Sequence, residues 1–165
     1  MTRLEAMSDR DFRESLDRAV ERRAARNVRR GWWTEADATG TARAELASEY
    51  SKGLATPDHR FLNVVDSASG ARVGEVWTVV ENKGGKTNVW VEWISIDPEF
   101  RRRGLATDAL RLVEEAAVRD GAERIGLYVV NDNPAALALY TKLGFHSYAQ
   151  EMVKTLVPAR TDAPA

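Results

Sequence analysis

The stretch Ile94–Thr107 reads ISIDPEFRRRGLAT, and it joins the end of an apolar strand to a turn and then to a helix. The alternation at its start is typical of a strand, Asp97-Pro98 ends that strand, and apolar residues recur at helical spacing after Gly104. Such a junction is an anion site, because unpaired amides and the positive end of the helix point at the same place. Gly104 and Ala106 are small enough to let an anion approach the backbone closely.

The same turn carries three consecutive arginines, Arg101, Arg102 and Arg103. Their guanidinium groups can form charge-assisted contacts with phosphate oxygens. A basic turn by itself is usually just a solvated surface, however. The sequence around the turn therefore has to decide between these two interpretations.

Three segments ahead of the turn have the composition of strands: Arg60–Asp66, Arg72–Glu81 and Lys86–Ile96. They are rich in Val, Ile, Trp and Phe, and the glycine-containing joints SASG and NKGGK separate them. This pattern predicts a meander of three antiparallel strands whose last member leads into the turn.

Helices and further strands are expected on both sides of the meander. Apolar residues recur at helical spacing ahead of it, and beyond it Asn133-Pro134 is a favourable helix start. The expected elements are helices at 9–30 and about 35–52, a helix from Leu105 that Gly121 ends, a strand at 124–130, a helix from Pro134 to Gly144 and a strand at 145–156. This order predicts an α/β (mixed α+β) fold, with helices on both faces of a mixed, mostly antiparallel sheet.

The length of the chain, 165 residues, is that of one domain. We expect this domain to cover residues 1–157 and residues 158–165 to form a disordered tail, because the tail is short and rich in Pro and Ala. No apolar run is long enough for an export signal or a membrane span. The expected location is therefore cytoplasmic, without membrane contact.

Charge and residue types exclude several classes of function. The 24 Lys and Arg residues nearly balance the 25 Asp and Glu residues, so no global field favours nucleic acid or an anionic membrane. Cysteine is absent from the sequence, which excludes a thiol nucleophile, disulfides and cysteine-ligated zinc. His59 and His146 lie far apart and lack a metal-ligand spacing, so we expect ordinary surface or partly buried histidines and no metal.

A second stretch, residues 127–145, reads LYVVNDNPAALALYTKLGF, and residues 152–156 read MVKTL. Together with the spacing Arg101-x-x-Gly104-x-Ala106, these motifs resemble the signatures of the GCN5-related N-acetyltransferase (GNAT) superfamily. Two ordered motifs with matching spacing are far more specific than either alone. The resemblance covers roughly residues 94–156, and the part before the meander matches only in its two-helix layout.

This resemblance implies that acetyl-CoA is the co-substrate and lies in a V-shaped gap, where the strand ending at Ile96 splays away from the strand ending at Val130. Backbone groups of Ile94 and Ile96 would pair with the pantetheine arm. The turn amides would hold the pyrophosphate, Asn133 would bond to the pantetheine side, and Tyr140 would face the sulfur. The further positions expected to contact acetyl-CoA are Arg101, Arg102, Arg103, Gly104, Leu105, Ala106, Thr107 and Ala136.

Acetyl transfer to an amine needs an oxyanion donor, a proton acceptor and a proton donor for the leaving thiolate. The Ile94 N–H is the expected oxyanion donor and Tyr140 the expected acid. Glu92 is the expected base, because it lies on the strand that leads into the gap, where the family often uses a glutamate. The alternative for Glu92 is an ordinary cross-strand charge pair, and a β-bulge would change which side chains face the substrate. Glu75 and Glu81 are the next candidates.

The acceptor site is the part least marked in the sequence. Trp32, Trp33, Tyr50 and the segment Gly53–His59 either wall an acceptor pocket or pack the helices on the sheet. We expect direct transfer to a primary amine of a small molecule. A peptide N-terminus or lysine is the first alternative acceptor, and a catalytically silent acyl-CoA-binding regulatory module is the alternative of another class. The sequence leaves a homodimer open.

Overall fold

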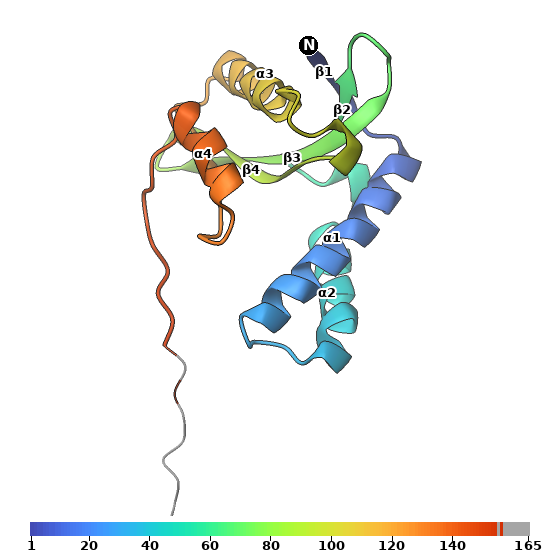
Figure 1. The fold of residues 1–165 in the computed structure, drawn as a ribbon, viewed down its shortest axis with the longest axis vertical. Helices are drawn as coiled ribbons and strands as arrows, with labels where there is room; N and C mark the ends of the chain where they lie inside the picture. Colours follow the sequence, from blue (N-terminus) through green and yellow to red (C-terminus); the bar gives the residue numbers. More distant parts are fainter. Residues whose placement is uncertain (155, 157–165) are drawn as a thin grey trace, which may run out of the picture. The chain divides into compact units, whose positions relative to one another are not determined.

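The computed structural model describes residues 1–154 and 156, and the chain divides into two units (Figure 1). The first unit, residues 1–130, contains a five-stranded sheet and the helices that cover it. The second unit starts at Asn131 and contains helix α4. The expectation of a single domain over residues 1–157 stays a prediction, and residues 157–165, with the expected tail, lie outside the described residues.

The sheet of the first unit has the strand order β1-β2-β3-β4-β5. Its strands are β1 (Thr2–Ala6), β2 (His59–Asp66), β3 (Arg72–Lys83), β4 (Lys86–Ile96) and β5 (Arg124–Leu127). The first four strands pair antiparallel, whereas β4 and β5 pair parallel. The predicted meander and the mixed, mostly antiparallel sheet are therefore confirmed.

Strand β1 is an addition to the prediction, which places no element ahead of the first helix. Its sequence, TRLEA, is too short for alternation to distinguish it from a loop. The strand forms because it pairs along its whole length with β2, from Thr2 opposite Asp66 to Ala6 opposite Leu62. A single sequence does not reveal such a distant partner.

Helices cover both faces of the sheet, as predicted (Figure 1). Helices α1 (Asp9–Arg29) and α2 (Glu35–Glu49) lie on one face, and α3 (Leu105–Arg119) lies on the other. Helix α1 begins with a capping box: the Ser8 hydroxyl accepts from the Asp11 N–H (3.2 Å), and the Asp11 carboxylate accepts from the Ser8 N–H (3.1 Å).

An aromatic cluster joins α1 and α2 to the sheet. The ring of Phe12 packs against Phe61 and Trp77, with ring centroids 4.6 and 5.9 Å apart, and Tyr50 packs against the same two rings. The indole N–H of Trp77 donates to the buried hydroxyl of Ser15 (3.0 Å). Burial of these rings supplies the main attraction between the helix pair and the sheet.

Strand β4 contains a β-bulge at Glu92. On β3, Trp77 pairs with Trp93 and the next residue, Thr78, pairs with Val91, so Glu92 has no partner of its own in this ladder. Neighbouring side chains of a regular strand point to opposite faces. The extra residue interrupts that alternation and brings the side chains of Glu92 and Trp93 to the same face.

The contacts of these two side chains show the shared face. Tyr50, at the end of α2, donates its hydroxyl to the Glu92 carboxylate (3.4 Å). Arg22 of α1 stacks over the Trp93 ring, with its guanidinium carbon 3.6 Å from the ring centroid. Both side chains therefore point towards the helix pair.

The two ladders of β4 end at different places. Pairing with β5 stops at Val91 and Leu127, whereas pairing with β3 continues to Ile96. The predicted continuation of β5 to Val130 is wrong, because residues 128–130 are not in a strand. The bulge at Glu92 bends β4 just beyond the last parallel pair, which accounts for the early end of β5.

In the second unit, helix α4 covers Pro134–Lys142. The Asn133 side-chain oxygen accepts from the Ala136 N–H (3.2 Å) and caps the helix, and Pro134 takes the first helical position. Gly144 has a φ of 89°, the left-handed conformation expected just past a helix end. The predicted start and end of this helix are confirmed.

The predicted strand at 145–156 is wrong. Among residues 145–154 and 156, which the structure describes, there is neither helix nor strand, and the sheet does not include them. Tyr148, Met152 and Leu156 are exposed. Alternating side chains form a stable strand only when another strand pairs with them, and the alternation in the sequence does not supply that partner.

Gly74 of β3 marks a close approach of two strands and gives a stability test. A Cβ atom there would lie 2.2 Å from the Ser95 carbonyl oxygen and 3.0 Å from the Ile96 Cδ1 atom. Gly74→Ala should therefore force β3 and β4 apart and lower the free energy of unfolding by roughly 1–3 kcal/mol. Gly40→Ala, at an open helical position, should instead raise it by about 0.5–1 kcal/mol. Urea unfolding measures both, and an unchanged midpoint for Gly74→Ala would contradict the close pairing.

Candidate active site

The turn between β4 and α3 contains two residues with left-handed backbone. A short 3₁₀ helix, η2 (Pro98–Phe100), follows β4, and then Arg102 has a φ of 63° and Gly104 a φ of 80°. Glycine adopts this conformation freely, whereas a residue with a side chain does so at a cost in free energy. Strain held at a helix start is an indication of a functional turn.

The first amides of α3 point into this turn. The first hydrogen bond of the helix runs from the Asp108 N–H to the Gly104 carbonyl (3.1 Å), so the N–H groups of Leu105, Ala106 and Thr107 precede it. Gly104 offers no side chain to cap them, and a Cβ built on it meets no described atom within 4 Å. Free amides, the positive helix end and open space together suit an anion, and the binding of an anion at this turn stays a prediction.

Two of the three arginines hold the turn itself. Arg101 donates from Nε to the Ile96 carbonyl (2.9 Å), and Arg103 donates from its guanidinium to the Glu99 carbonyl (3.0 Å). These donors are therefore not aimed at a ligand, and the backbone amides are the stronger candidates for holding an anion. A contact of Arg101, Arg102 or Arg103 with phosphate stays a prediction.

The free edge of β4 exposes the backbone groups of alternate residues. The Asp97 N–H donates to the Val73 carbonyl (2.9 Å), so at Asp97 the backbone faces β3. In an antiparallel pair the direction alternates residue by residue, which turns Ser95 towards β3 and turns Ile94 and Ile96 away from it. Ile94 and Ile96 therefore face the side on which the β5 ladder has already stopped, as the sequence-based prediction requires.

Glu92 lies in a partly buried polar cluster with Tyr50 and His59. Its carboxylate accepts from the Tyr50 hydroxyl (3.4 Å) and lies 3.5 Å from His59 Nε2. Burial raises the pKa of Glu92 above its ordinary value, although the nearby His59 opposes part of that rise. A carboxylate with a raised pKa binds a proton more readily than an exposed one, which suits a general base.

His59, expected from the sequence to be an ordinary surface or partly buried histidine, is a member of this cluster. Its Nδ1 atom lies 2.7 Å from the Pro57 carbonyl, which can only accept a hydrogen bond, so Nδ1 carries a proton. The other ring nitrogen, Nε2, is thereby turned to Glu92. The only signal in the sequence is that His59 ends the segment considered as an acceptor wall.

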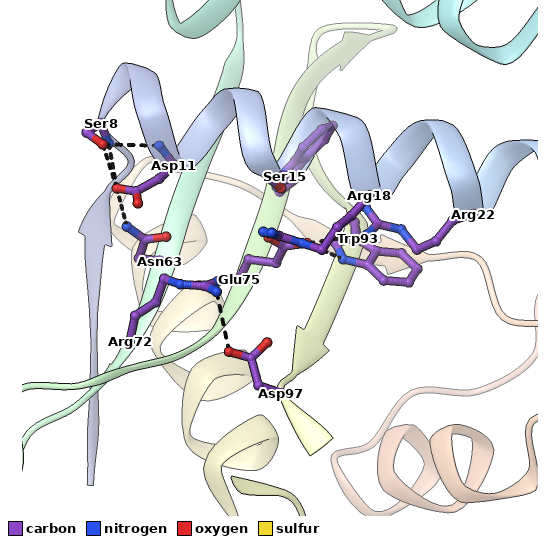
Figure 2. Close-up of polar contacts among 11 residues, drawn as sticks. Ser8, Asp11, Ser15, Arg18, Arg22, Asn63, Arg72, Glu75, Trp93 and Asp97 are labelled. Carbon is purple, nitrogen blue, oxygen red and sulfur yellow. Dashed lines mark hydrogen bonds and ion pairs between the residues drawn. The ribbon is translucent and has the colours of Figure 1, made fainter. Parts of the chain in front are cut away.

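Glu75, one of the two other candidate bases, is held by fixed partners (Figure 2). Its side chain is only 1% exposed and forms ion pairs with Arg18 and Arg22, the second at 3.4 Å. It also accepts from the indole N–H of Trp93 (3.0 Å). A carboxylate enclosed in this way ties α1 to the sheet, and its lone pairs are already in use.

Glu81 lies further along the β3–β4 hairpin, opposite Asn88. It pairs with Lys83 at 2.7 Å, and about a third of its side chain is exposed. Of the three candidate bases, Glu92 is thus the one whose carboxylate faces a hydroxyl and an imidazole beside the free edge of β4.

The proposed aromatic acceptor wall divides into packed and exposed residues. Tyr50 is buried in the aromatic cluster, and Trp33 packs against the same core. For these two, packing is the better interpretation. Trp32 is exposed, with the Arg30 guanidinium 4.8 Å from its ring centroid, and it remains available to a ligand.

The residues predicted from the second motif belong to the second unit. Asn133 and Ala136 form the cap of α4, which engages the side-chain oxygen of Asn133 and the N–H of Ala136. Tyr140 is partly buried and lies 5.8 Å from Phe145 between ring centroids. Burial raises the pKa of Tyr140, so its phenol keeps its proton to higher pH than a free tyrosine.

Residues 1–154 and 156 contain neither a metal-ligand cluster nor a membrane-spanning helix. In this part of the chain no three His, Asp or Glu side chains gather as metal ligands would. None of the helices described there has the length and apolar character needed to cross a bilayer.

Comparison with known proteins gives the family. The model of the "Acetyltransferase (GNAT) family" matches residues 22–145, which is most of the chain. The chain belongs to the GNAT family. The resemblance inferred from the motifs, the fold class and the assignment as an N-acetyltransferase are therefore confirmed.

Similar proteins occur in Bacillus subtilis. The uncharacterized N-acetyltransferase YdgE is 29% identical over 142 residues, which cover 86% of this chain and 90% of YdgE. The uncharacterized N-acetyltransferase YycN is 26% identical over 153 residues, covering 93% of this chain and 97% of YycN. The crystal structure of YycN superposes with a TM-score of 0.86 at 25% identity and covers 95% of this chain and 99% of that one.

GNAT acetyltransferases use acetyl-CoA, and the first unit offers groups that fit it. The open α3 terminus suits a pyrophosphate, because its amides lack acceptors within the helix and no Cβ fills the space at Gly104. The backbone of Ile94 and the Ile96 N–H suit a pantetheine arm, since amide groups of such an arm can pair with a strand edge, whereas the Ile96 carbonyl already accepts from Arg101.

The Gly104 turn predicts a specific loss of acetyl-CoA binding. Gly104→Glu places a side chain and a negative charge at the open helix terminus, and it should weaken acetyl-CoA binding by at least about tenfold. Gly121→Glu is the matched control, because Gly121 also has positive φ (77°) and open space but lies at the other end of α3. Calorimetry on the two folded variants measures the Kd for acetyl-CoA. Equal Kd values for Gly104→Glu and Gly121→Glu would show that the turn is not part of the binding site.

Proposed function

We propose that this GNAT enzyme transfers the acetyl group of acetyl-CoA directly to a primary amine of a small molecule, with both substrates bound together. The observation that carries the proposal is the bulge in β4. It turns the Glu92 carboxylate towards the helix pair two residues before the backbone of Ile94 faces the free strand edge. A base and an oxyanion donor thus come from one short segment.

The chemistry assigns each group one task. The amine nitrogen attacks the thioester carbonyl carbon, the C–S bond breaks, and the leaving sulfur takes a proton. Glu92 accepts the proton that the amine gives up, and the Ile94 N–H donates to the carbonyl oxygen as negative charge develops there. Tyr140, assigned from the family motif, supplies the proton for the thiolate, and its raised pKa keeps that proton in place at neutral pH.

A small amine is the proposed acceptor because packed side chains flank the Glu92 carboxylate and leave about a quarter of this side chain exposed. Tyr50 is buried, His59 is mostly buried, and both lie against the carboxylate. A panel of small primary amines and of peptides, read by release of the CoA thiol with a no-acceptor control, tests the proposal. Release with peptides alone would contradict it.

The proposed base predicts a change in the pH profile. In the wild type the rate should rise with pH as Glu92 loses its proton, and because its pKa is raised this rise should lie above the range of an ordinary glutamate. Glu92→Gln should lower the rate about 100-fold at neutral pH and recover part of it at high pH, where the amine is already neutral. Glu81→Gln, on the neighbouring strand, should follow the wild type. Steady-state rates from pH 6 to 10 measure this, and superimposable profiles for Glu92→Gln and wild type would exclude Glu92.

The proposed acid predicts a loss of rate without a loss of binding. Tyr140→Phe removes only the hydroxyl, so turnover should fall by about tenfold or more while the Kd for acetyl-CoA stays the same. Tyr148→Phe is the control, since Tyr148 is 91% exposed in the same unit. Single-turnover rates and calorimetry provide the two values. Wild-type single-turnover rates in Tyr140→Phe would show that the phenol only packs.

A further inference from the structure

The guanidinium group of Arg22 lies on the face of the sheet that carries Glu92. It stacks on the Trp93 ring at 3.6 Å, and one of its nitrogens lies 3.4 Å from a Glu75 oxygen (Figure 2). Three-quarters of the side chain is buried. The stack on Trp93 fixes the plane of the guanidinium, and the long contact to Glu75 uses little of its hydrogen-bonding capacity.

Arg22 shares its buried carboxylate partner with a second guanidinium. Glu75 is a single carboxylate that meets two guanidinium groups, those of Arg18 and Arg22, and Arg18 makes the shorter contact. Of the other acidic side chains on this face, Asp97 pairs with Arg72 at 3.5 Å, and Glu92 lies against Tyr50 and His59. Burial is the main reason that the pKa of Arg22 falls to about 10, although Glu75 and the neighbouring Glu21 favour its charged form. The group remains charged at neutral pH.

The remaining donors of Arg22 are accessible. A guanidinium has five N–H donors, and the contact to Glu75 engages one of the two terminal nitrogens. Among the described residues, the buried side-chain polar atoms without a partner are Thr2 Oγ1 and Asn63 Oδ1. No other described residue bonds to the remaining Arg22 donors, and none of these nitrogens is a buried atom without a partner. These donors therefore reach solvent. They can meet a ligand.

The bulge brings the residue under Arg22 and the proposed base to the same face. Glu92 and Trp93 are consecutive residues with side chains on one face, and Arg22 covers Trp93. Because Arg22 covers the residue that follows Glu92, its guanidinium and the proposed base lie on one face of the sheet. An acceptor whose amine lies at Glu92 can extend across this face towards Arg22.

We propose that Arg22 binds a carboxylate of the acceptor, so that the substrates are small primary amines with a carboxylate a few bonds from the nitrogen. This inference rests on the proposed function and adds the class of its acceptor. A planar guanidinium held against a ring presents two parallel N–H groups, which match a carboxylate.

The test compares acceptors that differ only in the carboxylate. A series of ω-amino acids of increasing chain length is assayed by CoA thiol release, each beside the n-alkylamine of the same length. The best ω-amino acid should exceed its alkylamine in kcat/KM by about 10- to 100-fold, mostly through KM. In Arg22→Met this ratio should fall close to one. Arg22→Lys keeps the charge but loses the paired N–H donors of the guanidinium, so its ratio should lie between those of the wild type and Arg22→Met.

Arg43→Met is the matched control. It removes one positive charge from the neighbouring helix, where Arg43 forms an exposed pair with Asp17 at 3.0 Å, and the wild-type ratio should persist. Arg22→Met should stay folded, because Arg18 and Trp93 still hold Glu75, and circular dichroism checks this.

The outcomes separate the two proposals. Thiol release with both series but equal kcat/KM within every pair overturns the carboxylate site and leaves amine acetylation intact. A preference that survives Arg22→Met also overturns it, because another group then holds the carboxylate. Release with none of these amines, by protein that binds acetyl-CoA, contradicts the proposed function and removes the basis of this inference with it.

Discussion

Strand β4 takes part in two ladders that end at different places, and the candidate site depends on this mismatch. Its parallel ladder with β5 stops at Val91, its antiparallel ladder with β3 continues to Ile96, and the bulge lies between these points. The same local change frees one strand edge and turns two consecutive side chains to one face. The free backbone groups at Ile94 and the side chains of Glu92 and Trp93 thereby come from the same short segment.

Glu75 explains how this segment is held against the helices. A carboxylate that is 1% exposed is stable only when its charge is matched, and Arg18, Arg22 and the Trp93 N–H match it from α1 and β4. The contact fixes α1 across β3 and β4. It also leaves donors of the Arg22 guanidinium unused on the face that carries Glu92, and these donors are the proposed carboxylate site.

The sequence predicted the features that depend on local pattern. Gly104 and the Asn133 cap lie where expected, since turn and cap chemistry acts over a few residues. Strand β1 was missed and the strand at 145–156 was wrong, because both depend on whether a distant strand pairs with them. His59 and Arg22 could not be assigned either. Each acts through residues far away in the chain, Glu92 and Trp93, and a bulge in β4 decides which way these point.

Exchange of single backbone amides tests the proposed co-substrate edge most directly, because neighbouring residues of β4 face opposite sides of the strand. Residue-resolved hydrogen exchange by NMR, with and without acetyl-CoA, reports on the amides of Ile94, Ser95 and Ile96. Ser95 faces β3 and should be protected in both states, whereas Ile94 and Ile96 should gain protection only with acetyl-CoA bound. Saturating acetyl-CoA that leaves Ile94 and Ile96 exchanging as in the free protein would contradict the claim that this edge holds the co-substrate.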